Sequence, residues 1–414
     1  MPSPPARHRG NLASLNVLRG AAALYVAAYH SVGALTPSGL SFDTRGGSMR
    51  LLRQGNPLGL LGFGLYAVLA FFILSGFVIH LRQAQHPDEP AQRGKLRWTA
   101  DYGWRRLLRI FPPLLTALVL TAVLAAAGYR LFRGWPWPDG NLTDARNVLV
   151  PAYGASAFSN NTPLWSVAYE IWFYVAYVPI VLVVLAHVRL PPRIRMGLVL
   201  AASLVVAWAL VLVQDHAPQL IPAPVQGLTS IFVYLPAWLA GAFLAELYAA
   251  DVKLPGRLWM VAPAAVLLAV ATFSSGNDLR PAVDLLWGLA ICLLIAALSL
   301  GPDMDWLTTR RGRWAASTSS WSYSLYLVHL PVILFAQAAL GYDGALRITN
   351  PLAVLAIFLA ALGVGWLFSH AIERPTVRLV SRSASGSTPG GPGRGEATTE
   401  ALRRAEAESR RSTR

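Results

Sequence analysis

Long apolar stretches recur along most of the chain, separated by short polar segments. About 20 apolar residues are enough to cross the hydrocarbon core of a bilayer as a helix. Ten such stretches are present, covering roughly residues 13–34, 58–80, 107–129, 164–186, 196–213, 227–249, 257–274, 281–300, 320–341 and 352–372. The pattern predicts an all-α, polytopic membrane protein, a bundle of about ten transmembrane helices.

Composition supports this interpretation. The 414 residues are 55% hydrophobic and only 13% charged, whereas ordinary soluble domains carry about 25% charged residues. So few charges cannot cover a water-facing surface, which excludes a soluble enzyme or a nucleic-acid binder as the bulk of the molecule. The only cysteine, Cys292, leaves no intrachain disulfide and no cysteine-based metal site.

The basic residues orient the predicted bundle. With the N-terminus in the cytoplasm, most of the 35 Lys and Arg residues fall on the cytoplasmic side, loop by loop. Both termini are therefore predicted to be cytoplasmic. The net charge of +15 is then explained by membrane orientation, and no nucleic-acid partner is expected.

The chain divides into three parts on this reading. Residues 1–11 form a cytoplasmic N-terminal segment, 12–376 the transmembrane domain, and 377–414 a disordered cytoplasmic tail. The first apolar stretch resembles a signal peptide, but it contains ionisable residues and has no convincing cleavage site, so we expect a retained helix. The segment Trp135-Pro-Trp137-Pro in the largest outer loop is interpreted as an interfacial anchor, with a substrate lip as the alternative.

Two ionisable residues lie inside the first apolar stretch, Arg19 and His30. Such groups cost about 2.5–3.5 kcal/mol each on insertion scales, so each needs a reason. Their spacing makes three helical turns, which places both side chains on one helix face about 16 Å apart. Arg19 could simply extend to the headgroups and His30 could fill a helix contact, but the shared face favours a functional role.

The fourth stretch adds a carboxylate, Glu170, at a depth similar to that of His30. A carboxylate there could orient or charge the imidazole, and the alternative is that Glu170 pairs with some other donor. Trp165 and Ser166 precede it, and Tyr174 follows one turn later. These three are further candidate site residues.

Other polar residues have weaker individual signals. Gly76, next to Ser75, allows close helix approach. Arg106 and Arg109 are one turn apart and could hold phosphate, although alone they are typical of cytoplasmic topology. His329 lies near mid-membrane, where a structural histidine is the favoured interpretation.

Together, these residues resemble a known family, the membrane-bound acyltransferase-3 family. The motifs that carry the resemblance are Arg19-x10-His30, Phe71-Phe-x-Leu-Ser75-Gly-Phe77, Arg106-x-x-Arg109-Ile-x-Pro112, Leu164-Trp165-Ser166-x-x-x-Glu170, Ser322-Tyr-x-x-Tyr-Leu-x-His329 and Ile372-Glu-Arg-Pro375. The resemblance implies an acyl-CoA donor loaded from the cytoplasm. It also implies a hydroxyl acceptor, usually on a sugar of a surface glycan or a glycosylated natural product.

The resemblance also assigns roles to residues. His30 becomes the catalytic base, with Glu170 as its possible partner. Arg19, Arg106 and Arg109 serve the donor, and Ser75 is placed with them. A base that deprotonates a hydroxyl contributes about 10²–10⁴ in rate, and an oxyanion donor is also needed. A backbone N–H, Tyr174 and Ser166 are the candidate donors.

We expect acetyl-CoA as the donor, no metal, and membrane lipids and a glycan or glycosylated small molecule as partners. Peptidoglycan, exopolysaccharide, lipid-linked sugar and macrolide sugar all remain open as acceptors. The expected location is the inner or plasma membrane of a bacterium. A transporter or flippase with a proton relay through His30, Glu170 and His329 is the alternative, and a non-catalytic scaffold is a third hypothesis.

Overall fold

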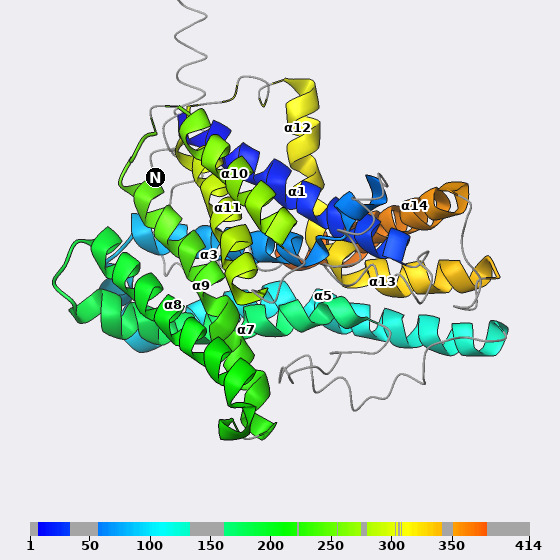
Figure 1. The fold of residues 1–414 in the computed structure, drawn as a ribbon, viewed down its shortest axis with the longest axis horizontal. Coiled ribbons are helices and arrows are strands. Elements are labelled where there is room, and N and C mark those ends of the chain that lie inside the picture. The colour runs from blue at the N-terminus through cyan, green and yellow to red at the C-terminus, as the bar shows by residue number, and fades with distance from the viewer. Residues whose placement is uncertain are drawn as a thin grey trace, which may run out of the picture.

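A computed structural model describes most of the transmembrane region as a bundle of packed helices (Figure 1). The described residues are 7–33, 57–132, 161–221, 223–254, 256–274, 280–302, 309–341 and 351–378, with the single residues 304 and 307. No strand occurs among them. The predicted loop segment at Trp135 and nearly all of the predicted tail lie outside these residues.

Each predicted apolar stretch coincides with a helix. These helices are α1 (Arg7–Gly33), α3 (Gly64–Gln85), α5 (Lys95–Leu131), α7 (Trp165–Pro179), α8 (Pro192–His216), α9 (Ala223–Ala249), α10 (Leu258–Ser274), α11 (Arg280–Leu300), α13 (Ser322–Ala339) and α14 (Pro351–Phe368). Two π-helical turns, η4 (Ile180–Leu185) and η8 (Ser369–Glu373), continue α7 and α14. The prediction of a polytopic helical bundle is confirmed.

Eight candidate membrane spans in the described residues are both long and apolar enough to cross a bilayer. The apolar parts of α10 and α11 are shorter, and these two helices pack against each other. Two further short helices, α4 (Glu89–Arg93) and α12 (Arg310–Ser317), connect spans. Hydropathy located the apolar part of each span but not its full length. For example, α5 begins at Lys95 because its first turns are helical but charged.

Helix α3 is largely buried and packs along α9 in the interior. The expected close approach at Gly76 is present: a Cβ atom there would lie 1.8 Å from the backbone oxygen of Trp238. Ile73 and Phe77, on either side, are fully buried. By contrast, α8 exposes large apolar side chains such as Val205, as expected for a helix that faces lipid.

Candidate active site

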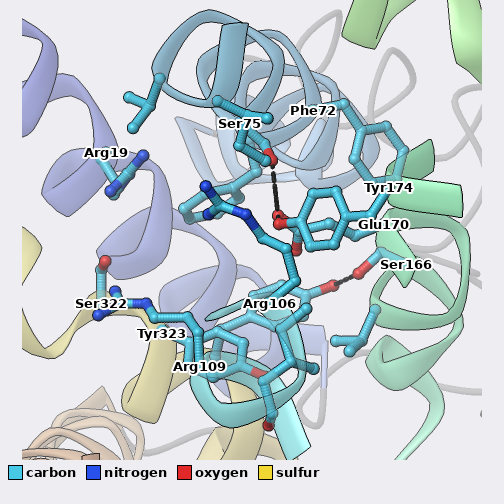
Figure 2. A pocket seen from close by; sticks show the side chains of 16 residues that line it. Arg19, Phe72, Ser75, Arg106, Arg109, Ser166, Glu170, Tyr174, Ser322 and Tyr323 are labelled. Atoms are coloured by element: carbon cyan, nitrogen blue, oxygen red, sulfur yellow. Dashed lines mark hydrogen bonds between the residues drawn. The ribbon is translucent and has the colours of Figure 1, made fainter. Parts of the chain in front are cut away.

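A cavity of about 210 Å³ lies between α1, α3, α5, α7 and α13. Seven of the ten residues singled out in the sequence line it: Arg19, Ser75, Arg106, Arg109, Ser166, Glu170 and Tyr174. These side chains come from α1, α3, α5 and α7, and Figure 2 shows them around the same space. Helix α13 completes the wall with Ser322, Tyr323 and Tyr326.

Helix α1 reaches the cavity because of a glycine next to Arg19. A Cβ atom on Gly20 would lie 1.9 Å from the hydroxyl oxygen of Thr318, in the 3-10 turn η7 (Thr318–Trp321) that precedes α13. Only glycine allows this approach without moving Thr318. The close contact sets Arg19 beside the start of α13, where Ser322 also lines the cavity.

The two arginines of α5 precede a pair of prolines. Pro112 and Pro113 lie inside the helix and lack the N–H groups that would bond to the carbonyls of Leu108 and Arg109. The helix nevertheless continues through them. Nearby, the Tyr323 hydroxyl donates to the Ile110 carbonyl at 3.2 Å, which ties α13 to α5 beside Arg109.

The cavity is rich in positive charge. The Arg106 guanidinium lies 5.6 Å from the ring centre of Tyr102 and 5.7 Å from that of Tyr174. Its buried Nε has no hydrogen-bond partner among the residues that the structure describes. Figure 2 shows Arg19, Arg106 and Arg109 entering the same space. Three guanidinium groups against the lining carboxylate of Glu170 make a site suited to an anionic ligand.

Glu170 is held by hydroxyl groups rather than by histidine. Its Oε1 accepts hydrogen bonds from Ser75, at 2.7 Å, and from Tyr174. The Ser75 oxygen also lies 3.4 Å from the indole nitrogen of Trp238, which donates to it. The predicted pairing of Glu170 with His30 is therefore not formed in this structure. Similar depth in the bundle did not ensure contact, because Glu170 faces α3.

His30 instead lies against His329. Their ring centres are 5.1 Å apart, and neither histidine lines the cavity. Tyr326 connects the two regions: its ring is 5.7 Å from that of His329, and its hydroxyl lies 2.6 Å from that of Ser166. Tyr326 thus contacts both His329 and the cavity.

Trp165 also lies outside the cavity lining. Its ring packs against those of Phe72, Tyr169 and Tyr234, with centres 5.3 to 6.2 Å apart. This contact fixes the start of α7 against α3 and α9. Trp165 therefore packs behind the residues that line the cavity and holds α7 in position.

One residue at the site was missed in the sequence. Glu373, in the π-helical turn after α14, is buried and accepts a hydrogen bond from Ser324 at 2.6 Å. Its other oxygen lies 3.4 Å from Arg109. The signal that could have identified it is a carboxylate at the end of the last apolar stretch.

A second polar cluster was also missed. His80 is fully buried, with Nδ1 2.7 Å from the Tyr177 hydroxyl and Nε2 2.8 Å from Glu246. Both ionisable residues lie within predicted spans. This cluster does not line the cavity. In the part of the chain that the structure describes, no group of three or more His, Cys, Asp or Glu residues could hold a metal ion.

Comparison with known proteins assigns the chain to a family. The family model described as an acyltransferase domain matches residues 12–370. The chain is also 26% identical, over 365 residues, to the acyltransferase MdmB of Streptomyces mycarofaciens, covering 82% of this chain and 88% of the relative. No solved structure matches the chain. On this evidence the chain belongs to the acyltransferase-3 family and is a multi-pass membrane enzyme that transfers acyl groups.

Proposed function

We propose that this enzyme transfers an acyl group, expected to be acetyl, from acyl-CoA to a hydroxyl of a glycan or a glycosylated metabolite. The observation that carries the proposal is the convergence of Arg19, Arg106 and Arg109 on one cavity. Coenzyme A carries several phosphate charges, and guanidinium groups are the side chains best matched to them. The buried Nε of Arg106, which has no partner in the described part of the chain, fits an anionic ligand that supplies the acceptor.

His30 is proposed as the catalytic base. It lies on the same helix as Arg19, about 16 Å farther along the axis, so the narrow pantetheine arm could lead from the arginines towards it. The acceptor oxygen would form a bond to the thioester carbon while its proton passes to His30. The C–S bond then breaks, and the proton returns to the leaving sulfur, so the enzyme ends unchanged.

The oxyanion of the transfer step would form between the three arginines and His30. Ser166 and Tyr174 are the proposed side-chain donors, with a backbone N–H as the alternative. Glu170 is proposed to orient the hydroxyls of Ser75 and Tyr174, since it accepts a hydrogen bond from each. It would also offset part of the arginine charge when no donor is bound.

The acceptor class is part of this proposal. The proposed acceptor is a hydroxyl on a sugar of a surface glycan or of a glycosylated small molecule. Membrane lipids are the proposed neighbours of the spanning helices. The family assignment favours this enzyme over a transporter or flippase with a proton relay. We therefore propose no second function.

The test is substitution of the proposed base. Purified protein in detergent should release free coenzyme A from acetyl-CoA when a glycosylated acceptor is present. His30→Ala should lower this rate by at least about 100-fold while acetyl-CoA still binds, because the three arginines remain. His216→Ala, at an exposed histidine at the end of α8, is the matched control and should behave like the parent enzyme.

Two results would contradict the proposal. If His30→Ala turned over acetyl-CoA at the parent rate, His30 would not be the base. If the parent protein neither bound nor consumed any acyl-CoA, the donor assignment itself would fail.

A further inference from the structure

We propose that His329 is the partner of His30, and that the two imidazoles form a proton-sharing pair. This inference rests on the proposed function, because it gives His30 the role of base. It assigns to His329 the supporting role that the sequence suggested for Glu170. Since His329 would act through His30, it is a positioning residue.

The hydrogen bonds of His329 determine which of its nitrogens carries the hydrogen. Nδ1 lies 2.8 Å from the carbonyl oxygen of Tyr326 and 3.2 Å from that of Leu325. A carbonyl oxygen can only accept, so Nδ1 must donate. In the neutral imidazole, Nε2 then carries the free lone pair.

That lone pair has no partner within the described residues. His329 is fully buried, and its Nε2 makes no hydrogen bond. A buried acceptor without a donor is costly and needs an explanation. The nearest ionisable ring is that of His30, at 5.1 Å between ring centres and a tilt of 41°. At this separation facing ring nitrogens can come within hydrogen-bonding reach.

The carboxylates near the cavity are engaged elsewhere. Glu170 is bonded to hydroxyls of α3 and α7, and Glu373 to Ser324 and Arg109. Among the described residues, the ring of the neighbouring Tyr29 also contacts His30, with ring centres 4.7 Å apart. Among the described residues, His329 is therefore a proton acceptor available beside the proposed base.

The pair would act during the transfer step. As the acceptor oxygen bonds to the thioester carbon, its O–H bond breaks and the proton moves to His30. The protonated His30 then donates a hydrogen bond to the free Nε2 of His329, which spreads the new positive charge over two rings. When the C–S bond breaks, the proton passes from His30 to the thiolate sulfur, and both histidines end neutral.

A neutral partner suits this position better than a carboxylate. A carboxylate beside His30 would itself need compensation inside the membrane before any proton arrives. His329 adds no charge in the resting state, yet it can accept a hydrogen bond when His30 becomes charged. Because it is neutral at rest but can accept a hydrogen bond during the reaction, a second histidine is assigned the role of partner to His30.

The test uses two amide substitutions of His329. His329→Asn keeps an N–H donor near the Nδ1 position but removes the acceptor at Nε2. His329→Gln places an amide oxygen near Nε2 but loses the Nδ1 donor. Measurements are kcat and KM for acetyl-CoA in the purified enzyme, with the thermal unfolding midpoint.

We expect His329→Asn to lower kcat by about 10- to 100-fold with KM for acetyl-CoA within about twofold, because the donor site is intact. His329→Gln should retain more activity than His329→Asn. The proposal is overturned if His329→Asn keeps the parent kcat, or if the Gln variant is the less active of the two. The second result would mean that only the bond to Tyr326 matters.

The outcome of His30→Ala separates this inference from the proposed function. If His30→Ala is inactive and His329→Asn is fully active, the base stands and the pair is wrong. If His30→Ala is active, the proposed base is wrong and the pair with it. Should His329→Asn fail to fold, the activity of His329→Gln decides: a kcat loss greater than 100-fold at unchanged stability overturns the pair.

Discussion

Two polar clusters lie little more than one helical turn apart along α3, and they differ in whether their polar groups all have hydrogen-bond partners. The sealed cluster (His80, Tyr177 and Glu246) links α3, α7 and α9. The cavity cluster (Ser75, Glu170 and Tyr174) links α3 and α7 beside three arginines. Both use an α3 residue, a tyrosine and a glutamate.

The difference lies in how the polar groups are satisfied. In the sealed cluster both histidine nitrogens have a partner, at 2.7 and 2.8 Å, so its bonds join helices and leave no free nitrogen on His80. In the cavity cluster the surrounding cations outnumber the lining carboxylate, and the Nε of Arg106 is unpaired within the described residues. A satisfied buried cluster therefore stabilises the bundle, whereas an unsatisfied one that faces a cavity is suited to bind.

Breaking the sealed cluster should give the largest effect. Glu246→Ala leaves His80 buried without its acceptor, and removing one partner of such a pair costs about 3–5 kcal/mol. We expect a lower free energy of unfolding in detergent, followed by intrinsic fluorescence. The kcat per folded molecule should change little, because the cluster does not line the cavity.

The milder variant Glu246→Gln serves as the matched control, since its amide oxygen can still accept from His80. It should lose clearly less stability than Glu246→Ala. A large loss of kcat in a fully folded Glu246→Ala enzyme would show that the sealed cluster takes part in catalysis.

Breaking the cavity cluster's charge should instead affect function. Arg106→Met keeps an unbranched apolar stem in place of the aliphatic part of the arginine but removes its charge and donors. We expect kcat/KM for acetyl-CoA to fall by about 100-fold, since charged hydrogen bonds contribute about 1.5–3 kcal/mol each, with little change in unfolding. Arg193→Met, at an exposed arginine on α8, is the control. An unchanged kcat/KM in Arg106→Met would mean that Arg106 only sets topology.

The sequence predicted the two clusters unequally. Apolar runs located the spans, and motifs in those runs named Arg19, Arg106 and Glu170 as site residues, which line one cavity. Counting residues along a helix gives depth, and that placed Glu170 level with His30. It does not give the rotation of one helix against another, so the partners of Glu170 could not be predicted.

Contacts between distant segments were equally hidden. Glu373 bonds to Ser324 across 49 residues, and His80 to Glu246 across 166. Each of these residues shows in the sequence only as an ionisable or polar group within or beside an apolar run. Which of them share a cluster depends on packing, which hydropathy does not encode.

Gly76 is close to both clusters, because it lies between Ser75 and His80 on α3. A Cβ atom there would lie 1.8 Å from the backbone oxygen of Trp238, and a backbone atom cannot rotate away. Gly76→Ala should therefore destabilise the protein by about 1–3 kcal/mol and should separate the indole of Trp238 from Ser75. Thermal unfolding and coenzyme A release measure the two effects.

Gly288→Ala, on α11 where a Cβ atom meets nothing, is the control for Gly76→Ala and should keep the parent stability. A Gly76→Ala enzyme of parent stability would show that α9 can shift freely away from α3.

The smallest effect on stability is expected for a glutamate that is paired with cationic side chains outside the membrane. Glu89, between α3 and α5, accepts from Arg82 at 2.8 Å and from Arg93 at 3.0 Å. Partial burial opposes the charged form, but the hydrogen bonds and charges of the two arginines outweigh it and hold the pKa of Glu89 below its usual value of 4.5. The carboxylate thus contributes stability above about pH 4.5, and this contribution is lost as the pH falls through the lowered pKa.

Glu89→Gln should therefore cost about 0.5 kcal/mol or less at pH 7, and its effect should disappear in strong acid, where Glu89 is neutral too. Urea unfolding at neutral and acidic pH, with and without high salt, measures this difference. Salt should reduce the neutral-pH effect, because Arg82 is more than half exposed and water and ions screen the pair. Suppose instead that Glu89→Gln lowered the free energy of unfolding as much as Glu246→Ala does, and independently of salt. Glutamates paired with cationic partners would then contribute equally inside and outside the bundle, and burial would not explain the difference between them.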